Sequence, residues 1–436
     1  MSVSRRDALK LAGAAALGGL LATDARAAVG RDAALYPGGT ADRWPIVQGP
    51  TDRTSATFIV MAPTAASFAM EVVAGGIARP EPRLLNRLDL PALGVGMFEV
   101  QVTGLAPGRD FELTLRDDGG GTFDRRLFRT LDLDRPSGRF AVASCMDEGY
   151  RRKAITMWET LAREAPDFVI LLGDTCYADR RNPGRDEAGI ARRYVETRLG
   201  LAWFRLERLV PTFAVWDDHD LGGDNGDRTF VHLPFARRLF DAFWGTTGNS
   251  AWRRGLGVGS RLEGFGQRFY LMDDRSFRDP RGTQGGRQWG AEQMDWLFEE
   301  IGTDPTPAWI MSGGQYFGLQ ALRESMEDDQ PVELADLLQR LSRIAAPAAF
   351  MSGDVHFSAI AAIGPERLGY PTYEFTSSSI HSTVNPGPVG RGKVVAERRH
   401  NFMTFDVETR RGWQVGARSI LDGGAVAFAR TAAIAR

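Results

Sequence analysis

The segment DFVILLGDTCYAD, residues 167–179, decides the fold of the chain. Its unbroken apolar run, FVILL, predicts a strand that is buried on both faces. The run ends at Gly173 and Asp174, where the chain becomes polar. The helical pattern KAITMWETLARE (153–164) precedes it, and before that the apolar segment FAVASC (140–145) predicts another buried strand. Buried strands that alternate with helices predict an α/β domain.

The same alternation continues along the chain. Apolar segments that end in small or acidic residues predict strands, and helical segments lie between them. The predicted strands are TFAVWDDHD (212–220, a strand and then a loop), RFYLMDD (268–274), PAWIMSGG (307–314), AAFMSGD (348–354) and PTYEFTS (371–377). The predicted helices cover about Asp186–Leu209, Leu233–Trp244, Gly290–Ile301 and Val332–Ala345. We expect one α/β domain over residues 138–430.

Residues 40–133 show a different pattern. Apolar and polar residues alternate with a period of two, and Gly, Pro and Asp separate the segments, as in strands with one buried face. The segments are TSATFIVMAP (54–63), SFAMEVVAG (67–75), GMFEVQVTGL (96–105) and DFELTLRD (110–117). The turn and strand in LAPGRDFELTLRD (105–117) are common in fibronectin-like sandwiches. We therefore expect an all-β, fibronectin-like sandwich before the α/β domain.

The first 27 residues have the features of an export signal. SRRDALK (4–10) carries paired arginines, and LAGAAALGGLLA (11–22) is weakly apolar and too short to span a bilayer. The small residues of ARA (25–27) suit a cleavage site. These features predict a signal peptide of the twin-arginine type, which would bring the folded protein to the twin-arginine export machinery. We expect a periplasmic or secreted protein.

The composition of the chain also bears on its partners and on its cysteines. The 53 basic and 55 acidic residues give a net charge of −2. The chain therefore lacks the excess of basic residues that would predict a nucleic-acid partner. No segment has the eighteen apolar residues of a transmembrane helix. The two cysteines, Cys145 and Cys176, leave two alternatives open. An oxidising compartment favours a disulfide between them, whereas the position of Cys145 at a strand end favours a metal ligand.

Polar and titratable residues follow four of the predicted strands. Because ligands bind beyond the carboxyl ends of strands in α/β sheets, these residues should converge. Several carboxylates in one place would repel each other unless a cation is present. In MSGDVHFSA (351–359), Asp354 and His356 should share one face of a strand. The residues are Ser144, Cys145, Asp174, Tyr177, Asp179, Asp217, Asp218, His219, Asp224, Asn225, Asp354 and His356.

Four motifs carry a family resemblance. ASC (143–145), LLGDTCYAD (171–179), VWDDHDLGGDN (215–225) and MSGDVHFS (351–358), in this order, resemble the PhoD-type alkaline phosphatases and phosphodiesterases. These enzymes are a branch of the calcineurin-like metallophosphoesterases. LMDDRSFRD (271–279) also resembles a segment of that family. The resemblance implies a metallophosphoesterase-type α/β sandwich as the catalytic domain, preceded by the β-sandwich.

The resemblance also implies a metal centre. It predicts an Fe³⁺ ion and one or two Ca²⁺ ions, and Zn²⁺, Mn²⁺ or Mg²⁺ would also suit such donors. Asp174 would bridge the Fe³⁺ and a Ca²⁺. The implied Fe³⁺ ligands are Cys145, Asp174, Tyr177 and His356, and the implied Ca²⁺ ligands are Asp218, Asp354 and, behind a glycine-containing insertion, Asn225.

His219 is the implied catalytic residue. It would not bind metal, but would stabilise or protonate the leaving oxygen. The chain departs from the family at Asp220, where glutamate is common. The expected activity is hydrolysis of phosphoric esters by metal-activated hydroxide. The expected substrates are small phosphate esters or phospholipid head groups, and neither monoesters nor diesters are favoured.

Other interpretations stay open. A phospholipase D-like phosphodiesterase would use the same chemistry, and a non-catalytic calcium-binding surface protein would also use acidic residues and a β-sandwich. EFTSSSIHSTVN (374–385) contains Ser378 and His381, so a serine esterase is an alternative, although no Gly-x-Ser-x-Gly motif is present. Arg275 and Arg278 would either clamp a substrate phosphate or pair with buried carboxylates.

Overall fold

The computed structural model describes residues 43–73, 81–150, 156–181, 185–318, 324–386 and 394–436. The predicted signal peptide, residues 1–27, lies outside the described residues. The chain forms two compact units. The N-terminal unit contains the described residues up to Asp132 together with residues 194–212 and 241–250, and the C-terminal unit contains the rest. The prediction placed those two later segments in the α/β domain, but the structure groups them with the N-terminal unit.

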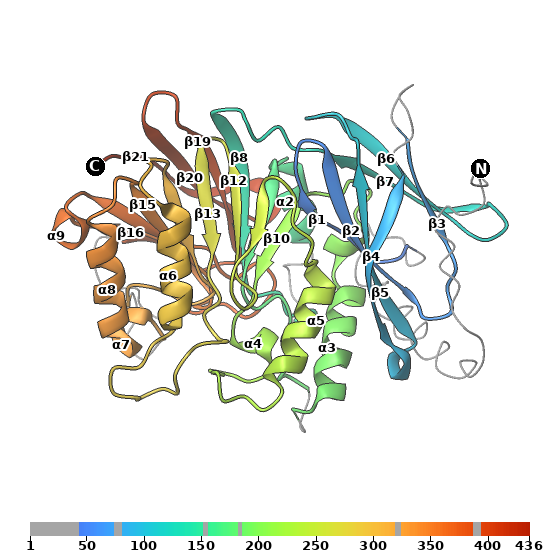
Figure 1. Cartoon of the computed structure of the whole chain (residues 1–436), viewed down its shortest axis with the longest axis horizontal. Helices are drawn as coiled ribbons and strands as arrows, with labels where there is room; N and C mark the ends of the chain where they lie inside the picture. Colours follow the sequence, from blue (N-terminus) through green and yellow to red (C-terminus); the bar gives the residue numbers. More distant parts are fainter. Residues whose placement is uncertain (1–42, 74–80, 151–155, 182–184, 319–323, 387–393) are drawn as a thin grey trace. The chain divides into compact units, whose positions relative to one another are not determined.

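The N-terminal unit contains two antiparallel sheets (Figure 1). One has the strand order β1-β2-β5-β4, and the other has the order β3-β6-β7. Strands are therefore present in all four segments whose alternation predicted them. The bounds are β1 (Ile46–Thr51), β2 (Ser55–Pro63), β3 (Ala69–Val73), β4 (Pro82–Leu90), β5 (Val95–Thr103), β6 (Asp110–Arg116) and β7 (Thr122–Arg129).

Both sheets of this unit share one apolar core. Phe58 and Phe98 come from the first sheet, and Phe111 and Phe128 come from the second. The rings of Phe58 and Phe128 lie 4.9 Å apart, edge to face. Burying one such side chain contributes about 1.5–3 kcal/mol to stability. The unit is thus two layers of sheet on a common core, and the fibronectin-like connectivity stays a prediction.

The C-terminal unit is built on two larger mixed sheets, with strand orders β10-β9-β8-β19-β20-β21 and β11-β12-β13-β14-β15-β17-β16-β18. β8 and β9 are parallel, as are β13, β14, β15 and β17 in turn. The bounds are β8 (Ser137–Ala143), β9 (Phe168–Leu172), β10 (Thr212–Val215), β11 (Trp252–Arg254), β12 (Ser260–Gly264), β13 (Gln267–Leu271), β14 (Ala308–Met311), β15 (Ala348–Ser352), β16 (Ser358–Ile363), β17 (Thr372–Thr376), β18 (Val394–Glu397), β19 (Asn401–Glu408), β20 (Trp413–Leu421) and β21 (Val426–Ile434).

Aromatic side chains fill the space between these two sheets. Phe140 of β8 stacks on Phe405 of β19, with ring centroids 5.0 Å apart. It also meets Phe269 of β13 edge to face at 5.1 Å, and Trp309 of β14 at 5.7 Å. Edge-to-face pairs of this kind contribute about 0.5–1.5 kcal/mol beyond the buried area. The predicted α/β architecture is therefore present, with two sheets that pack face to face.

The helices agree with the predictions except at their ends. α5 and α6 match the predicted ranges, and Arg340 of α8 pairs with Asp295 of α6 at 2.9 Å, which places these helices side by side (Figure 1). The helix predicted to reach residue 209 ends at Gly200, because Leu201 is extended. The bounds are α2 (Met157–Arg163), α3 (Glu187–Gly200), the 3₁₀ helix η4 (Ala202–Arg205), α4 (Asp218–Leu221), α5 (Leu233–Trp244), α6 (Gly290–Ile301), α7 (Met326–Asp329), α8 (Pro331–Leu341) and α9 (Pro365–Leu368).

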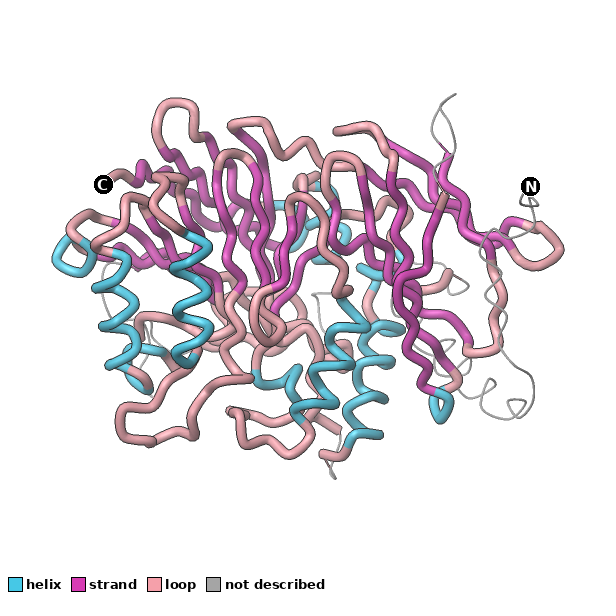
Figure 2. The backbone as a smooth tube through the Cα atoms, in the orientation of Figure 1, coloured by secondary structure: helices cyan, strands magenta, loops and turns pink. Residues whose placement is uncertain are grey.

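The C-terminal strands were not among the predictions. β19 pairs with β8 in the middle of its sheet, and β20 and β21 extend that sheet to its edge. In β20, buried residues alternate with half-buried ones as far as Ser419, and the half-buried positions there are Gln414, Gly416 and Arg418. Figure 2 shows loops at both ends of the strands in this unit, with longer ones below the sheets. None of the helices in the described part of the chain has both the length and the apolarity needed to cross a bilayer.

Candidate metal centre

The predicted site residues follow four strands of the C-terminal unit. β10, β9 and β8 are neighbours in one sheet, and β15 lies in the other. The ends of such strands are where α/β proteins bind ligands. Cys145 follows β8, Asp174 and Tyr177 follow β9, Asp218 and His219 lie in α4 after β10, and Asp354 and His356 follow β15.

Two groups of donor side chains converge there. The first group is Cys145, Asp174 and His356, and the second is Asp174, Asp218 and His219. Within each group, one donor atom of every residue lies within 4.8 Å of the others. Asp174 belongs to both groups. A carboxylate shared in this way suits a centre that holds two metal ions.

Left-handed backbone conformations occur at four of these residues. The angle φ is +61° at Cys145, +51° at Asp174, +63° at Asp354 and +61° at His356. Each such angle costs a non-glycine residue about 1–3 kcal/mol, so the surrounding packing must hold it. The prediction that Asp354 and His356 share one face of a strand is wrong. β15 ends at Ser352, and both residues lie in the loop that follows it.

The turn after β9 requires a glycine. The angle φ is +75° at Gly173, and a Cβ atom there would lie 2.4 Å from the Cβ atom of Asp217. Asp217 in turn begins α4, where its side chain and that of Asp220 form a capping box. The backbone at the end of β9 therefore packs against the side chain of Asp217 at the end of β10. This close packing fixes the positions of Asp174 and Asp218, the residues that follow.

Cys145 is a buried thiol among polar groups. Its Sγ lies 3.4 Å from Oδ2 of Asp174 and accepts a hydrogen bond from Oγ of Ser378 at 3.0 Å. Burial and the carboxylate of Asp174 raise the pKa of the thiol well above its ordinary value. A bound cation would reverse this effect and stabilise the thiolate. Cys145 and Cys176 are not joined in a disulfide, which favours the ligand alternative.

The surroundings of the Asp174 carboxylate indicate most clearly that this site is suited to a cation. Its side chain is 1% exposed, and Oδ1 accepts no hydrogen bond from the described residues. Burial, together with the charges of Asp218 and Asp220, raises its pKa well above the ordinary value. An unsatisfied buried carboxylate oxygen is costly unless a cation binds it. The donors present therefore fit a metal ion at this position.

Tyr177 and His356 hold each other in place. The Tyr177 hydroxyl lies 3.1 Å from Nε2 of His356, and Nδ1 of His356 lies 2.8 Å from Oγ1 of Thr383. Ser382 donates a hydrogen bond to the Tyr177 hydroxyl at 3.1 Å. Burial and the charge of Asp174 raise the pKa of Tyr177. Partners of this kind orient metal ligands. Tyr177 therefore contacts a member of the first donor group, and its role as a ligand stays a prediction.

Asp218 is held by backbone donors. Its two oxygens accept hydrogen bonds from the backbone N–H groups of His219, at 2.8 Å, and of Asn225, at 2.6 Å. Burial alone would raise the pKa of Asp218, but His219, Arg275 and these N–H groups lower it to about 2. The side chain of Asn225 is exposed. The structure thus brings the backbone of Asn225 to Asp218, and the predicted role of its side chain as a ligand stays a prediction.

Asp354 belongs to neither donor group, although it lies close to both. Its backbone oxygen is 3.6 Å from Sγ of Cys145. Burial and the charges of Asp218 and Glu324 raise the pKa of its carboxyl group to about 7. A carboxylate in this electrostatic setting would also gain from a nearby cation. The role predicted for Asp354 therefore rests on proximity and charge.

His219 is oriented by a residue to which the sequence assigned no role. Its Nδ1 lies 2.8 Å from Oδ1 of Asp179, and its ring lies 4.3 Å from that of Tyr177. Burial alone would lower the pKa of His219, but the surrounding carboxylates, Asp174 and Asp218 first, raise it to about 10. Asp179 was visible as the last acid of the strand-end motif LLGDTCYAD, and its partner shows what it does.

The two arginines of LMDDRSFRD are structural in this protein. Arg275 is completely buried and pairs with Asp217 and, at 3.0 Å, with Glu324. Arg278 pairs with the same Glu324 at 2.6 Å. Of the two alternatives, buried pairing with carboxylates is therefore the one that the contacts favour. This network lies behind Asp218 and lowers its pKa.

The histidine of the serine esterase alternative is already engaged. Nδ1 of His381 accepts a hydrogen bond from Nε1 of Trp158 at 3.1 Å, and Nε2 lies 2.9 Å from the carbonyl oxygen of Tyr150. Burial lowers the pKa of His381 to about 4. Ser378 donates to Cys145 instead of to a histidine. The contacts give no support to a Ser378–His381 pair.

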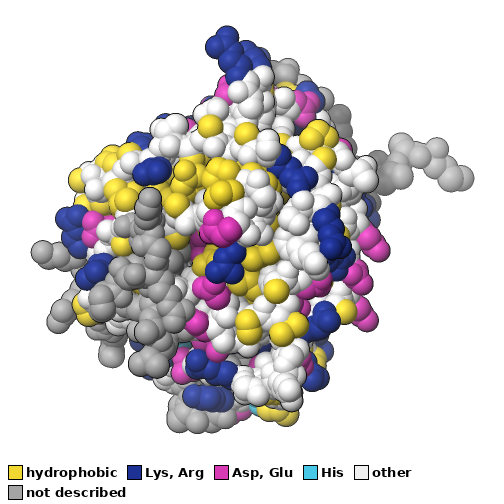
Figure 3. All heavy atoms as spheres, turned by 90° about the vertical axis from the view of Figure 1, so that its left-hand side faces the viewer, with side chains coloured by type: hydrophobic (Ala, Val, Ile, Leu, Met, Phe, Trp, Pro, Cys, Tyr) yellow, Lys and Arg dark blue, Asp and Glu magenta, His cyan; other side chains and the backbone are white. Residues whose placement is uncertain are grey.

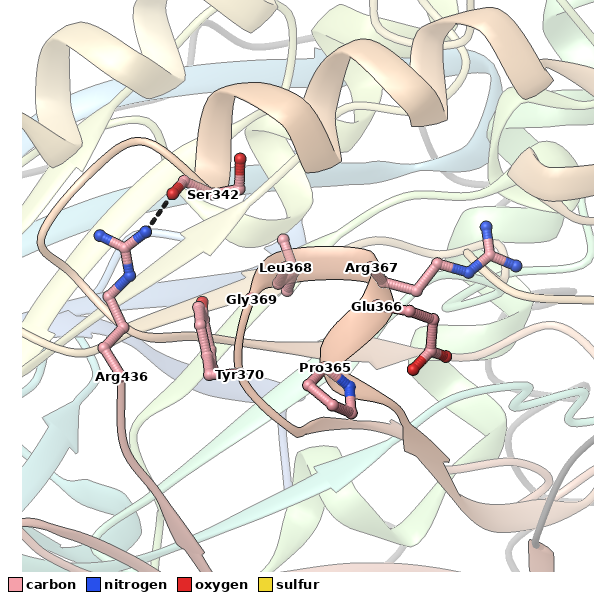
Figure 4. A pocket seen from close by; sticks show the side chains of 8 residues that line it. All are labelled: Ser342, Pro365, Glu366, Arg367, Leu368, Gly369, Tyr370 and Arg436. Carbon is pink, nitrogen blue, oxygen red and sulfur yellow. Dashed lines mark hydrogen bonds between the residues drawn. The ribbon is translucent and has the colours of Figure 1, made fainter.

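A surface pocket lies beside α9, which lies between β16 and β17 in the sequence. It has a volume of about 470 Å³ and contains none of the candidate metal ligands. Arg436 crosses it and donates a hydrogen bond to the carbonyl oxygen of Ser342 (Figure 4). On the face near α9, basic and acidic side chains are interspersed with hydrophobic ones (Figure 3). The pocket is lined by Ser342, Pro365, Glu366, Arg367, Leu368, Gly369, Tyr370 and Arg436.

Comparisons with known proteins agree with the motifs. The family model described as PhoD-like phosphatase matches residues 140–228, which contain the first three motifs. A solved structure of PhoD is similar to this chain with a TM-score of 0.67 and 16% sequence identity, over 89% of this chain and 88% of that one. Comparison with curated proteins gave no match. The resemblance to the PhoD-type family that the motifs predicted is therefore confirmed, by the family model for residues 140–228 and by the solved structure for the fold.

Proposed function

We propose that the chain is an exported, metal-dependent phosphoric ester hydrolase. The observation that carries the proposal is the sharing of Asp174 between two donor groups at the strand ends. The match of residues 140–228 to PhoD-like phosphatases supports hydrolysis of phosphate esters as the reaction. Export through the twin-arginine machinery, with removal of residues 1–27, is part of the same proposal.

The donor types suggest which ions the site would hold. Cys145, Tyr177 and His356 offer sulfur, phenolate and imidazole, and together with Asp174 they suit Fe³⁺. Asp218 and Asp354 offer carboxylate oxygens, which suit Ca²⁺. Zn²⁺, Mn²⁺ and Mg²⁺ remain alternatives for both positions.

The metal ions would supply a nucleophile at neutral pH, by lowering the pKa of water, and would neutralise charge on the phosphoryl oxygens. The protein's own residues would orient the imidazole of His219 and transfer a proton through it. Asp179 holds Nδ1 of His219, so Nε2 is the nitrogen that would face the leaving oxygen. Nε2 of His219 would donate its proton to that oxygen.

Elemental analysis combined with two assays tests the proposal. The purified full chain should contain close to stoichiometric iron and calcium, and should hydrolyse p-nitrophenyl phosphate or bis-p-nitrophenyl phosphate in a chelator-sensitive way. The ratio of the two rates would report the preference between monoesters and diesters. Bound calcium without turnover of either ester would favour the calcium-binding surface protein, and turnover that resists chelators would overturn metal dependence.

The two cysteines offer a matched control. Both are buried and neither is in a disulfide, but among the described residues only Cys145 belongs to a donor group. Cys145→Ser should lose bound iron and activity, whereas Cys176→Ala should keep both. Equal behaviour of the two variants would contradict the assignment of Cys145 as a ligand.

A further inference from the structure

Arg180 lies beside the candidate metal centre. Its guanidinium carbon is 4.0 Å from the centre of the Tyr177 ring, and the Tyr177 hydroxyl contacts His356 at 3.1 Å. Its side chain is 36% exposed. A guanidinium over an aromatic face is held by a cation–π interaction. The guanidinium of Arg180 is therefore held in a fixed position and is accessible to solvent, and only Tyr177 lies between it and His356 of the first donor group.

The hydrogen-bonding capacity of Arg180 is mostly unused. Nη1 donates to Oδ2 of Asp147 at 3.0 Å. Within the described part of the chain, the guanidinium makes no other hydrogen bond, although it carries five N–H groups. Asp147 is also shared, because Arg181 donates to its other oxygen at 3.0 Å. Because Asp147 divides its two oxygens between two arginines, and Arg181 also pairs with Glu148, Asp147 engages only part of the Arg180 guanidinium.

Electrostatics link this charge to the centre. Burial alone would lower the pKa of Arg180, but the nearby Tyr177, Asp147 and Asp174 raise it. Arg180 thus interacts with Asp174, the residue that both donor groups share. A guanidinium binds phosphate oxygens through paired, charge-assisted hydrogen bonds. Its free N–H groups suit a ligand oxygen at the centre.

We propose that Arg180 binds a terminal oxygen of the substrate phosphate and makes the enzyme favour phosphate monoesters over diesters. This inference rests on the proposed function. A diester has two terminal oxygens and one negative charge, whereas a monoester dianion has three terminal oxygens and two charges. In a two-metal site both ions stabilise phosphoryl oxygens. The third oxygen of a monoester then needs a donor from the protein, and Arg180 is placed to be that donor.

Arg181 is the matched control. It pairs with the same Asp147, and also with Glu148 at 2.8 Å, and its side chain is 50% exposed. Unlike Arg180, it has no contact with the Tyr177 ring among the described residues. Replacing it removes one positive charge from the same edge of the site without removing the proposed phosphate contact.

The experiment compares Arg180→Gln, Arg180→Lys and Arg181→Gln in metal-loaded full-length protein. We expect Arg180→Gln to lower kcat/KM for p-nitrophenyl phosphate about 10- to 100-fold, since charge-assisted hydrogen bonds contribute about 1.5–3 kcal/mol. The loss for bis-p-nitrophenyl phosphate should be no more than about threefold, because that ester lacks the third terminal oxygen. Inorganic phosphate should inhibit Arg180→Gln more weakly than wild type. Arg180→Lys should recover part of the loss, and Arg181→Gln should resemble wild type.

The outcomes separate the inference from the proposed function. Equal losses for both esters, together with lost metal, would mean that Arg180 only supports Tyr177, and would overturn the inference. Unchanged kinetics in Arg180→Gln would overturn it as well. Wild-type protein that contains metal yet hydrolyses neither ester would instead overturn the proposed function, and the inference with it.

Discussion

The core of the N-terminal unit and the candidate metal centre of the C-terminal unit both contain fully buried side chains, but of opposite chemistry. Phe58 and Phe98 are 0% exposed and belong to a cluster of buried apolar side chains. Cys145 and Asp174 are 0% and 1% exposed, and they meet other titratable groups. Burial of phenylalanine stabilises the fold. Burial of a carboxylate without a counter-charge destabilises it.

This difference teaches that depth of burial alone does not indicate what a residue does. In the aromatic core, shape and apolar area matter. At the strand ends, four non-glycine residues have left-handed backbone angles, and buried carboxyl groups have raised pKa values. Such costs persist where function requires them. Substitutions in the two regions should therefore have opposite effects on stability and on activity.

The largest effect should follow from Asp174→Asn. This variant removes the one carboxylate that both donor groups share. The loss of kcat should exceed the roughly 100-fold typical of residues that only orient metal ligands. The stability of the chelator-treated protein should not fall, because burial raises the pKa of Asp174 and its charge opposes folding at neutral pH. Ester hydrolysis and chemical denaturation would measure the two effects, and a marked destabilisation without loss of activity would contradict the comparison.

The next effect in size should be seen with Phe98→Ala. The ring of Phe98 lies 5.3 Å from that of Phe68, and the guanidinium of Arg87 lies over it at 4.8 Å. Removing a buried phenylalanine side chain costs about 3–5 kcal/mol of unfolding free energy. Activity per folded molecule and bound metal should stay close to wild type. Denaturant titration followed by tryptophan fluorescence, with metal analysis of the folded fraction, tests this.

A smaller effect is expected when Asp179 is replaced. Asp179→Ala removes the acceptor for Nδ1 of His219, and should lower kcat about 10- to 100-fold, as is typical for partners that orient a site histidine. Asp179→Asn should lose less, because its amide oxygen can still accept that hydrogen bond. Metal content should be unchanged in both variants. If the two variants were equally impaired, charge rather than orientation would be the contribution of Asp179.

The sequence predicted most of the fold because its patterns were local. The run FVILL and the period-two segments of the N-terminal unit each specify a strand without reference to the rest of the chain. β19 was missed because its pairing with β8 joins residues far apart in the sequence, such as Met403 with Val142, so tertiary context decides that it is a strand. β20 and β21 each form an antiparallel pair with the segment just before them, so sequence separation does not explain why these two were missed.

The site was predictable as a set of residues but not as a geometry. Strand-end position and residue type identified Cys145, Asp174 and His356, which the structure brings together. The backbone angles of these residues could not be predicted, because the residue types in a motif such as GDVH are compatible with a strand as well as with the left-handed loop that the structure shows. The same limit explains Asn225, whose backbone rather than side chain reaches Asp218. Pairings such as Asp179 with His219 need the fold before they can be recognised.

The smallest effect concerns acid stability, where the two regions should differ in sign. In the N-terminal unit, Asp52 accepts hydrogen bonds from the N–H groups of Thr54 and Ser55 at 2.8 and 2.7 Å, and from Ser250. Burial opposes these contacts, but together they lower its pKa, so its stabilisation is present above about pH 4 and is lost as pH falls through the folded-state value. Asp354 behaves in the opposite way without bound metal: its pKa is raised to about 7, so acidification from pH 7 toward pH 4 should stabilise the protein. Asp52→Asn should cost about 1 kcal/mol at pH 7, shrinking toward zero at pH 3, since an amide cannot accept from both sides. Denaturation of the chelator-treated wild type, Asp52→Asn and Asp354→Asn at pH 7, 5 and 3 measures how the contribution of each carboxyl group to the unfolding free energy changes with pH. If both contributions changed in the same direction, the two regions would bury their carboxyl groups in the same way.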